Sequence, residues 1–272
     1  MRIKVDNIDI KSILLSGACF RVIEEQDGSF TNILKDRVVN LKQEDNYIIV
    51  NSSDMNNIEE VINNYFDLNK DYDTCNKEIV KSNPELKKTV KDCSSYRILN
   101  QDPFEMGISY IISQNNNVKR ISYSINELSN KYGEKVVFNN KEYHLFPKYD
   151  VLKKLKVEDF RNIGVGFRDK YIVNYLNEYN NLSDINNLST KDALDKLMSI
   201  KGIGLKVASC ILLFGYHRFD VFPIDTWVKK YMCENYNLKE DVKEIEKYAK
   251  EHFGEYSGLI IQYMFHSQRN VK

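Results

Sequence analysis

The alternation of hydrophobic and polar residues describes two halves of the chain. From Ala18 to Glu24 apolar and polar positions alternate, Asp27-Gly28 is typical of a tight hairpin turn, and residues 29–34 resume the alternation. Two further runs, 37–41 and 47–50, are short and rich in Val, Ile and Tyr. The first fifty residues therefore predict short strands.

From Met55 onward the pattern has a helical period. Apolar residues between 55 and 66 fall on one helical face, and a helix after Pro84 is expected to end near Cys93. Further helices are expected from Pro103, over 118–132, and near residues 151, 167, 190, 204, 225, 239 and 256, with a small hairpin within 135–146. We expect an α+β protein with an N-terminal antiparallel β-rich domain over 1–98 and an α-helical domain over 99–272.

The amino-acid composition favours a globular protein over a membrane-spanning, secreted or metal-binding one. A hydrophobic content of 42% and four prolines in 272 residues describe an ordinary globular chain. Its longest mainly apolar run, about 207–216, is too short to span a bilayer, and the N-terminus has no secretory pattern. The five cysteines form no CxxC pair, which favours reduced thiols and disfavours a zinc or iron–sulfur site. We expect a cytoplasmic protein, nucleoid-associated if bacterial, with no membrane partner.

The net charge of zero gives no support to a nucleic-acid partner, because such proteins usually have a basic balance. Any phosphate contacts must come from a local patch and from backbone amides.

The stretch Ser199–Gly204 joins two predicted helices, 190–198 and 205–214. Its glycines let the backbone approach a surface closely, and the amides at the start of the second helix form a site for an anion such as a phosphodiester. The alternative is a tight turn between helices in which the glycines only supply positive φ.

Lys206 stands in the first turn of the second of these helices, where the helix dipole disfavours an ammonium by about 0.3–1 kcal/mol. A desolvated, neutral lysine is a nucleophile suited to Schiff-base chemistry. Cys210 follows Lys206 at i+4 and therefore lies on the same face of this helix.

Asp225 begins the next helix, either as an N-cap or as a carboxylate that stabilises a developing cation. The amide run 113–117 is either a polar helix end or part of a site.

Six motifs in this order resemble those of the 8-oxoguanine DNA glycosylase/AP lyases of the helix-hairpin-helix superfamily. They are Ser16-Gly17 with Phe20-Arg21, QDPFE (101–105), SQNNN (113–117), GVGFR (164–168), GIGLKVASC (202–210) and FPID (222–225). The chain lacks the C-terminal four-cysteine cluster of the endonuclease III branch, and it has a hairpin lysine that the alkylated-base branch does not normally have. The resemblance implies that the helical half is a glycosylase domain with its helix-hairpin-helix at 190–214.

The resemblance also implies the roles of the site residues. Lys206 is expected to attack C1′ of a flipped nucleotide, expel the base and leave a Schiff base that undergoes β-elimination, with Asp225 stabilising charge on the sugar. The carbonyl of Gly17 would accept the N7–H that distinguishes 8-oxoguanine from guanine. Cys210 and Phe265 would sandwich the base.

Opposite the lesion, Asn115 is expected to enter the vacated space, and Arg120 and Arg168 to grip the orphaned cytosine. Phe167 stands where relatives often have a tyrosine wedge. Phosphate contacts are expected from four residues of the helix starts: Gly202, Gly204, Val207 and Trp227.

Two departures from the family pattern affect recognition. Ile261 stands where relatives often have a glutamine that reads the Watson–Crick edge; either a one-residue shift brings the adjacent Gln262 into the pocket, or this contact is missing. Trp227 replaces a frequent phosphate-binding histidine. We expect a monomeric enzyme on double-stranded DNA containing 8-oxoguanine, with no required cofactor and room for a structural cation at the hairpin carbonyls. The alternatives are a glycosylase for another lesion and a DNA-binding module without catalysis.

Overall fold

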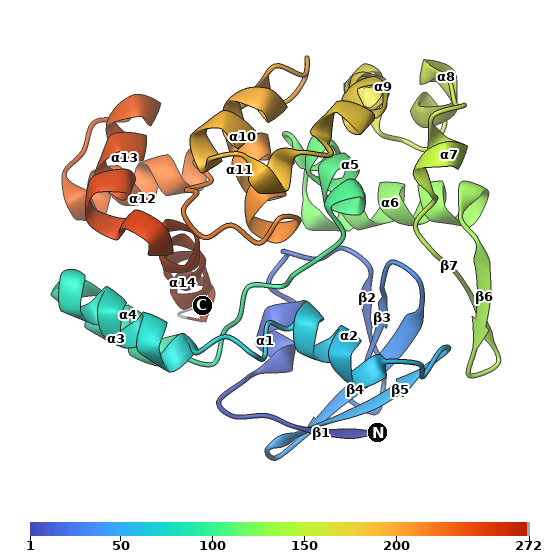
Figure 1. Cartoon of the computed structure of the whole chain (residues 1–272), viewed down its shortest axis with the longest axis horizontal. Helices are drawn as coiled ribbons and strands as arrows, with labels where there is room; N and C mark the ends of the chain where they lie inside the picture. The colour runs from blue at the N-terminus through green and yellow to red at the C-terminus, as the bar shows by residue number, and fades with distance from the viewer. Residues whose placement is uncertain (271–272) are drawn as a thin grey trace.

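The computed structural model of the protein describes residues 1–270 (Figure 1). Its N-terminal part contains an antiparallel sheet with the strand order β1-β5-β4-β3-β2. The strands are β1 (Arg2–Lys4), β2 (Val22–Glu24), β3 (Phe30–Ile33), β4 (Val38–Glu44) and β5 (Tyr47–Ser52). The predicted strands of the first fifty residues are confirmed.

Side-chain alternation and local caps fix this sheet. Leu41 pairs with Val50, and both are buried because alternate residues of β4 and β5 face the core. The β2–β3 turn has Gly28 at a φ of +77°, where glycine carries no steric penalty. Helices α1 (Ile10–Leu14) and α2 (Ile58–Tyr65) lie against the sheet (Figure 1); Tyr65 accepts a hydrogen bond of 2.8 Å from Asn32 of β3.

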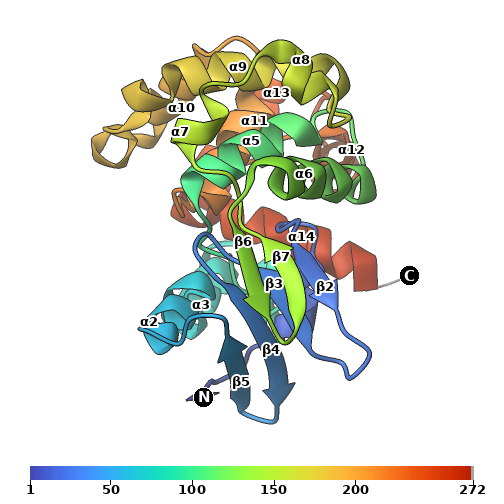
Figure 2. The same ribbon diagram turned by 90° about the vertical axis from the view of Figure 1, so that its right-hand side faces the viewer.

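The remainder of the described chain is almost entirely helical. Its helices are α3 (Tyr72–Ser82), α4 (Lys87–Asp92), α5 (Pro103–Ser113), α6 (Val118–Tyr132), α7 (Tyr149–Leu152), α8 (Val157–Arg161), α9 (Asp169–Glu178), α10 (Thr190–Met198), α11 (Leu205–Phe214), α12 (Thr226–Tyr236), α13 (Val242–Tyr248) and α14 (Ser257–Asn270). The predicted hairpin is β6 (Lys135–Phe138) with β7 (Lys141–His144), which extends beside the N-terminal sheet (Figure 2). The α+β fold class is confirmed.

Local capping explains why α5 and α6 have the predicted bounds. The Asp102 carboxylate accepts hydrogen bonds from the amides of Phe104 and Glu105 at 3.1 and 3.0 Å. Asn117 caps α6 in the same way, and Gly133 follows its last residue. A Cβ at Gly133 would lie 2.0 Å from the carbonyl oxygen of Leu145, so only glycine fits there.

The last helix returns to the first half of the chain. Helix α14 packs on α4, the Cys93 thiol lies 3.4 Å from the Tyr263 carbonyl, and the Tyr263 hydroxyl donates to Asn76 at 2.8 Å. The proposed domain boundary near residue 98 falls in the extended segment between α4 and α5, and the last two residues of the proposed helical domain lie outside the described residues.

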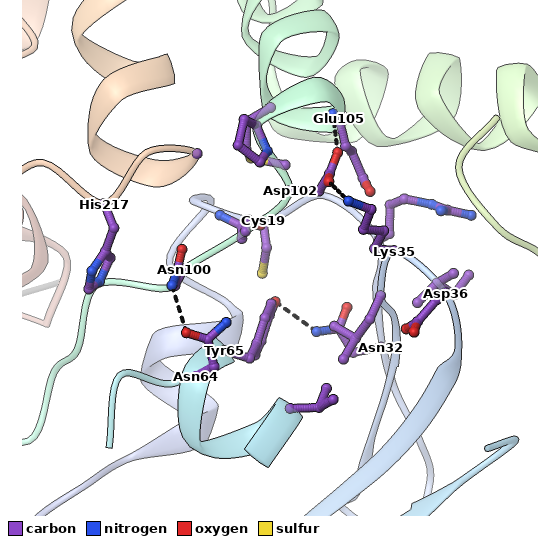
Figure 3. Close-up of a pocket in the computed structure, with 18 of the residues that line it drawn as sticks. Cys19, Asn32, Lys35, Asp36, Asn64, Tyr65, Asn100, Asp102, Glu105 and His217 are labelled. Atoms are coloured by element: carbon purple, nitrogen blue, oxygen red, sulfur yellow. Dashed lines mark hydrogen bonds and ion pairs between the residues drawn. The ribbon is translucent and has the colours of Figure 1, made fainter. Parts of the chain in front are cut away.

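A cavity of about 480 Å³ lies where β3 and α2 meet the start of α5 (Figure 3). Lys35 and Asp102 line it and form an ion pair of 2.8 Å. Two buried charges also line it. Arg21 donates to the carbonyl of His144 in β7, and Glu105 is only 7% exposed. Burial raises the pKa of Glu105 from 4.5 to about 7, and the nearby Arg21 guanidinium opposes this shift.

A pH dependence of stability follows from Glu105. Below pH 4.5 the carboxyl is protonated in both the folded and the unfolded chain. As the pH rises, the unfolded chain loses this proton first, so the free energy of unfolding falls until the pH passes the folded-state value of about 7. The full loss corresponds to about 3 kcal/mol.

Urea denaturation at pH 5 and pH 8 measures this loss. In Glu105→Gln the decline in the free energy of unfolding between the two pH values should be smaller than in the wild type. Glu60→Gln, at an exposed position of α2, is the control and should leave the decline unchanged. An unchanged decline in Glu105→Gln would contradict the prediction.

Candidate active site

Helices α10 and α11 pack against each other and are joined by residues 199–204, as predicted. Gly202 has a φ of +104°, and a Cβ there would lie 2.2 Å from the ring of Tyr171. At Gly204, the N-cap of α11, a Cβ would meet no atom within 4 Å. The first glycine is therefore required by the fold, whereas the second leaves the amides at the start of α11 open to a ligand.

Two side-chain amides hold the hairpin from within the protein. Gln114 donates to the Gly202 carbonyl at 3.0 Å, and Asn174 donates to the Lys201 carbonyl at 3.0 Å. The hairpin is thus tied to the end of α5 and to α9. Within residues 1–270, no group of three or more His, Cys, Asp or Glu side chains could hold a metal ion.

Lys206 is half-buried in the first turn of α11. Its Nζ lies 3.4 Å from the hydroxyl of Ser113 and 5.4 Å from the centroid of the Tyr110 ring, both on α5. The amine is therefore held over an aromatic surface rather than extended into solvent. Ser113 belongs to the SQNNN run (113–117) that the sequence marks as a candidate part of the site, whereas Tyr110, one helical turn earlier on α5, was missed by sequence reasoning.

Asp225 is the N-cap of α12, and its Oδ1 accepts a hydrogen bond of 2.8 Å from the amide of Val228. Asp225 therefore does cap the helix, and the cap occupies one of its two carboxylate oxygens. Cys210 is buried and interacts electrostatically with both Lys206 and Asp225. Burial raises the pKa of this thiol, which keeps it neutral beside the lysine. The fold thus brings all three side chains together.

The proposed base-recognition residues come from both ends of the chain. Gly17 has a φ of +87° in the loop after α1. Phe265 of α14 packs edge-on against Trp227 of α12, with ring centroids 5.2 Å apart. Ile261 is buried, whereas the neighbouring Gln262 is half-buried.

Gln262 has a polar partner in the site region: its Oε1 lies 3.5 Å from the hydroxyl of Tyr96. Because Ile261 has no polar side-chain atom, Gln262 is the residue of this pair that can form a hydrogen bond with a base.

The residues expected at the opposite base gather around the end of α5. Asn115 is exposed, with a φ of +47°. Arg120 is exposed on α6, and Phe167 is 56% exposed. Arg168, by contrast, is buried and donates to the carbonyls of Gln114, Asn115 and Val165. In this conformation its guanidinium holds the turn that presents Asn115, which sequence reasoning missed.

The helices differ in whether their first turn carries an acidic side chain. Among the described helices of eight or more residues, an acidic side chain occurs in the first turn of α2, α3, α5, α9 and α10 but not of α6, α11, α12 and α14. Lys119 and Arg120 stand in the first turn of α6, and Lys206 in that of α11. Cations at a helix N-terminus are unfavourable, so the starts of α6 and α11 suit an external anion, whereas the start of α12 is already capped by the Asp225 carboxylate. Val207 is buried and contributes to this surface only its backbone, while Trp227 is half-buried.

A helix-hairpin-helix with a lysine in its second helix and an aspartate at the next helix start defines a class of base-excision proteins, and comparison with known proteins agrees. The family model described as HhH-GPD superfamily base excision DNA repair protein matches residues 108–255, and the N-terminal domain model of 8-oxoguanine DNA glycosylase matches residues 1–106. The chain belongs to the 8-oxoguanine DNA glycosylase family of the HhH-GPD superfamily.

Individual relatives agree with this family. A probable N-glycosylase/DNA lyase of Methanothermobacter thermautotrophicus is 30% identical over 63% of this chain, and the match spans 62% of that relative. The apo 8-oxoguanine glycosylase/lyase of Clostridium acetobutylicum is 35% identical, with a TM-score of 0.92 over 97% of this chain and 94% of that chain. The same enzyme in complex with double-stranded DNA containing cytosine opposite 8-oxoguanine gives a TM-score of 0.91 at 35% identity, over 98% and 93% of the two chains. No helix in residues 1–270 combines the length and apolar character needed to cross a membrane.

Proposed function

We propose that the protein is a bifunctional 8-oxoguanine DNA glycosylase and AP lyase acting on duplex DNA. The observation that carries the proposal is the position of Lys206, half-buried at the head of α11 with Asp225 and Cys210 beside it. The names of the relatives agree with this activity.

The proposed reaction begins when the damaged nucleotide leaves the base stack, which costs a few kcal/mol. The Lys206 amine attacks C1′ through its lone pair, the bond from C1′ to the base breaks with its electron pair on the base, and the proton that the amine loses on bonding neutralises the departing base. Asp225 stabilises the positive charge that develops on the sugar. Ring opening leaves an imine, loss of a C2′ proton expels the 3′ phosphate, and the strand is cut. The amine supplies the nucleophile, so the mechanism calls for no cofactor.

Recognition in this proposal depends on one hydrogen bond. The carbonyl of Gly17 accepts from the N7–H of 8-oxoguanine, while guanine presents a lone pair there and leaves the carbonyl unsatisfied, at a cost of about 1–3 kcal/mol. Cys210 and Phe265 hold the two faces of the base, and Gln262 reads its Watson–Crick edge. A neutral thiol suits the first of these roles, because an anion would repel the electron-rich base.

DNA binding is compatible with a net charge of zero because phosphates can be bound by a local group of cations, such as Lys119 and Arg120 in the first turn of α6. The starts of α6, α11 and α12 lack first-turn acids, and we propose that the Gly202–Gly204 hairpin, the Val207 amide and the indole N–H of Trp227 bind phosphates. We further propose a monomeric, cytoplasmic enzyme. A structural cation at the hairpin would have to share the carbonyls that already accept from Gln114 and Asn174.

Borohydride trapping on a duplex with 8-oxoguanine opposite cytosine is the direct test. A covalent adduct with strand cleavage supports the proposal. Excision from duplexes with an alkylated purine or mispaired adenine, but not 8-oxoguanine, would indicate a glycosylase for another lesion. Binding without base release or cleavage on any duplex would indicate a DNA-binding module.

We also predict a preference for cytosine opposite the lesion of at least about tenfold over adenine, equivalent to 1.4 kcal/mol. The orphaned cytosine offers acceptors at O2 and N3 that suit a guanidinium, whereas adenine lacks this pattern. Arg120 is exposed and free to reach them, while Arg168 would first have to release the carbonyls of Gln114 and Asn115. Arg120→Ala should therefore bring the ratio close to one.

Single-turnover rates on the four opposite-base duplexes measure this preference. Lys119→Ala, which removes the neighbouring exposed charge from the same turn of α6, is the control and should keep the ratio. Equal wild-type rates opposite cytosine and adenine would contradict the prediction and indicate that Arg120 and Arg168 bind phosphates instead of the orphaned base.

A further inference from the structure

Exposed hydrophobic side chains concentrate beside the proposed opposite-base residues. Nine large hydrophobic side chains are exposed among the described residues, and three of them, Val118, Tyr123 and Phe167, belong to the start of α6 and to the adjoining loop 164–168. Only two of the nine are aromatic, and both are in this group. Phe167 already has an expected role as a wedge, but Tyr123 has none.

Tyr123 is 61% exposed, so burial in the core does not explain an aromatic residue at this position. Its ring lies next to Gly164, where a Cβ would be 3.9 Å from the Tyr123 Cε1. The adjacent Ser124 hydroxyl lies 3.5 Å from the Gly164 carbonyl, so α6 and the loop are tied together at this point. One edge of the ring thus lies beside the loop that carries Phe167.

The surroundings of this ring suit a nucleic acid rather than an apolar protein partner. Arg120 precedes Tyr123 by one helical turn, and the first turn of α6 carries Lys119 and Arg120 with no acidic side chain. Arg120 also interacts electrostatically with Arg168, the residue next to Phe167. The aromatic rings of Tyr123 and Phe167 therefore flank a group of cations, which is the combination that binds stacked bases along a phosphate backbone.

We propose that Tyr123 stacks on a nucleobase of the undamaged strand, next to the orphaned base. The proposal rests on the proposed function, since it requires that the duplex lie across α6 and the 164–168 loop. Stacking on a ring does not depend on base identity. Tyr123 would therefore strengthen binding to the opened duplex without selecting the base opposite the lesion.

Binding measured by fluorescence anisotropy, in the Lys206→Gln background so that the duplex stays intact, tests the proposal. Tyr123→Ala should weaken binding to the 8-oxoguanine·cytosine duplex by about tenfold, whereas Tyr123→Phe, which keeps the ring, should bind like the parent. Val137→Ala, equally exposed on β6, is the matched control and should also bind like the parent. Because the ring is exposed, the melting temperature of Tyr123→Ala should match that of the control.

A 2-aminopurine in the undamaged strand beside the cytosine gives a direct readout. Stacking on Tyr123 quenches its fluorescence, so the Tyr123→Ala complex should be brighter than the parent complex at saturation. Unchanged binding in Tyr123→Ala would overturn the proposal. So would a Tyr123→Phe variant as weak as Tyr123→Ala, because the contact would then be made by the hydroxyl. If the Lys206→Gln parent itself fails to bind the duplex, it is the proposed function that fails.

Discussion

Replacing Lys206 with Gln should abolish base release, strand cleavage and borohydride trapping while damaged duplex is still bound. The amide nitrogen of glutamine is not nucleophilic, so no bond to C1′ forms and no imine is available for reduction. The shorter amide can still donate toward the Ser113 hydroxyl that now lies 3.4 Å from the amine, so the local packing of α11 on α5 should survive. Single-turnover excision, gel-based trapping and binding anisotropy measure the three effects separately.

Lys191→Gln is the matched control. Lys191 is the second residue of α10, as Lys206 is of α11, so the two variants remove the same charge from equivalent positions of the two hairpin helices. Lys191 is exposed, and its variant should be trapped like the wild type. A Lys206→Gln protein that still forms a covalent adduct would show that another amine is the nucleophile.

The helices that position the site were predictable because their ends are encoded locally. Asp102 and Pro103 specify the start of α5, Asn117 that of α6, and Gly133 its end. Helix α11 is almost wholly apolar, α10 buries Ala193 and Leu197, and a glycine turn separates the two helices. Each of these signals lies within a few residues of the boundary that it determines, so no tertiary information was needed.

Three elements of the first half escaped prediction for the opposite reason. Strand β1 has only three residues and forms by pairing with β5, forty-five residues later in the chain. Helix α1 has five residues, too few to establish a period. In α3 the buried face includes Asn76, whose side chain accepts from Tyr263 of α14, so the stripe looks polar until the partner helix is in place.

The site itself was predictable only in part. The glycine turn and the position of Lys206 indicate an anion site and a nucleophile, but the roles of Gly17 and Phe265 came from the family resemblance, not from periodicity. Nothing in the sequence indicated that Ser113, ninety-three positions from Lys206, contacts the amine. The burial of Arg168 was equally hidden, because its partners are backbone carbonyls, which any residue type provides.

Asp225→Asn should slow base excision by two or more orders of magnitude, comparable to the loss of one preorganised charge-stabilising group in other enzymes, about 10²–10³-fold. The carboxylate lies at the start of α12 beside Lys206 and Cys210, where it can oppose the positive charge that develops on the sugar. Asparagine presents a neutral oxygen of similar shape at the same place. Binding of damaged duplex should persist, and single-turnover rates at saturating enzyme measure the loss.

The same substitution separates the two roles of Asp225, because asparagine and aspartate cap helices comparably. The hydrogen bond from the Val228 amide, now 2.8 Å, can be kept by the asparagine oxygen, so the melting temperature should stay near that of the wild type. Asp241→Asn is the control: Asp241 caps α13 through the Glu244 amide at 2.9 Å and lies outside the proposed site, so neither stability nor rate should change appreciably. Asp225→Ala should lose both the rate and about 1 kcal/mol of stability. If Asp225→Asn lowered the melting temperature but excised at the wild-type rate, Asp225 would be a helix cap alone, and the charge on the sugar would have to be stabilised by another group.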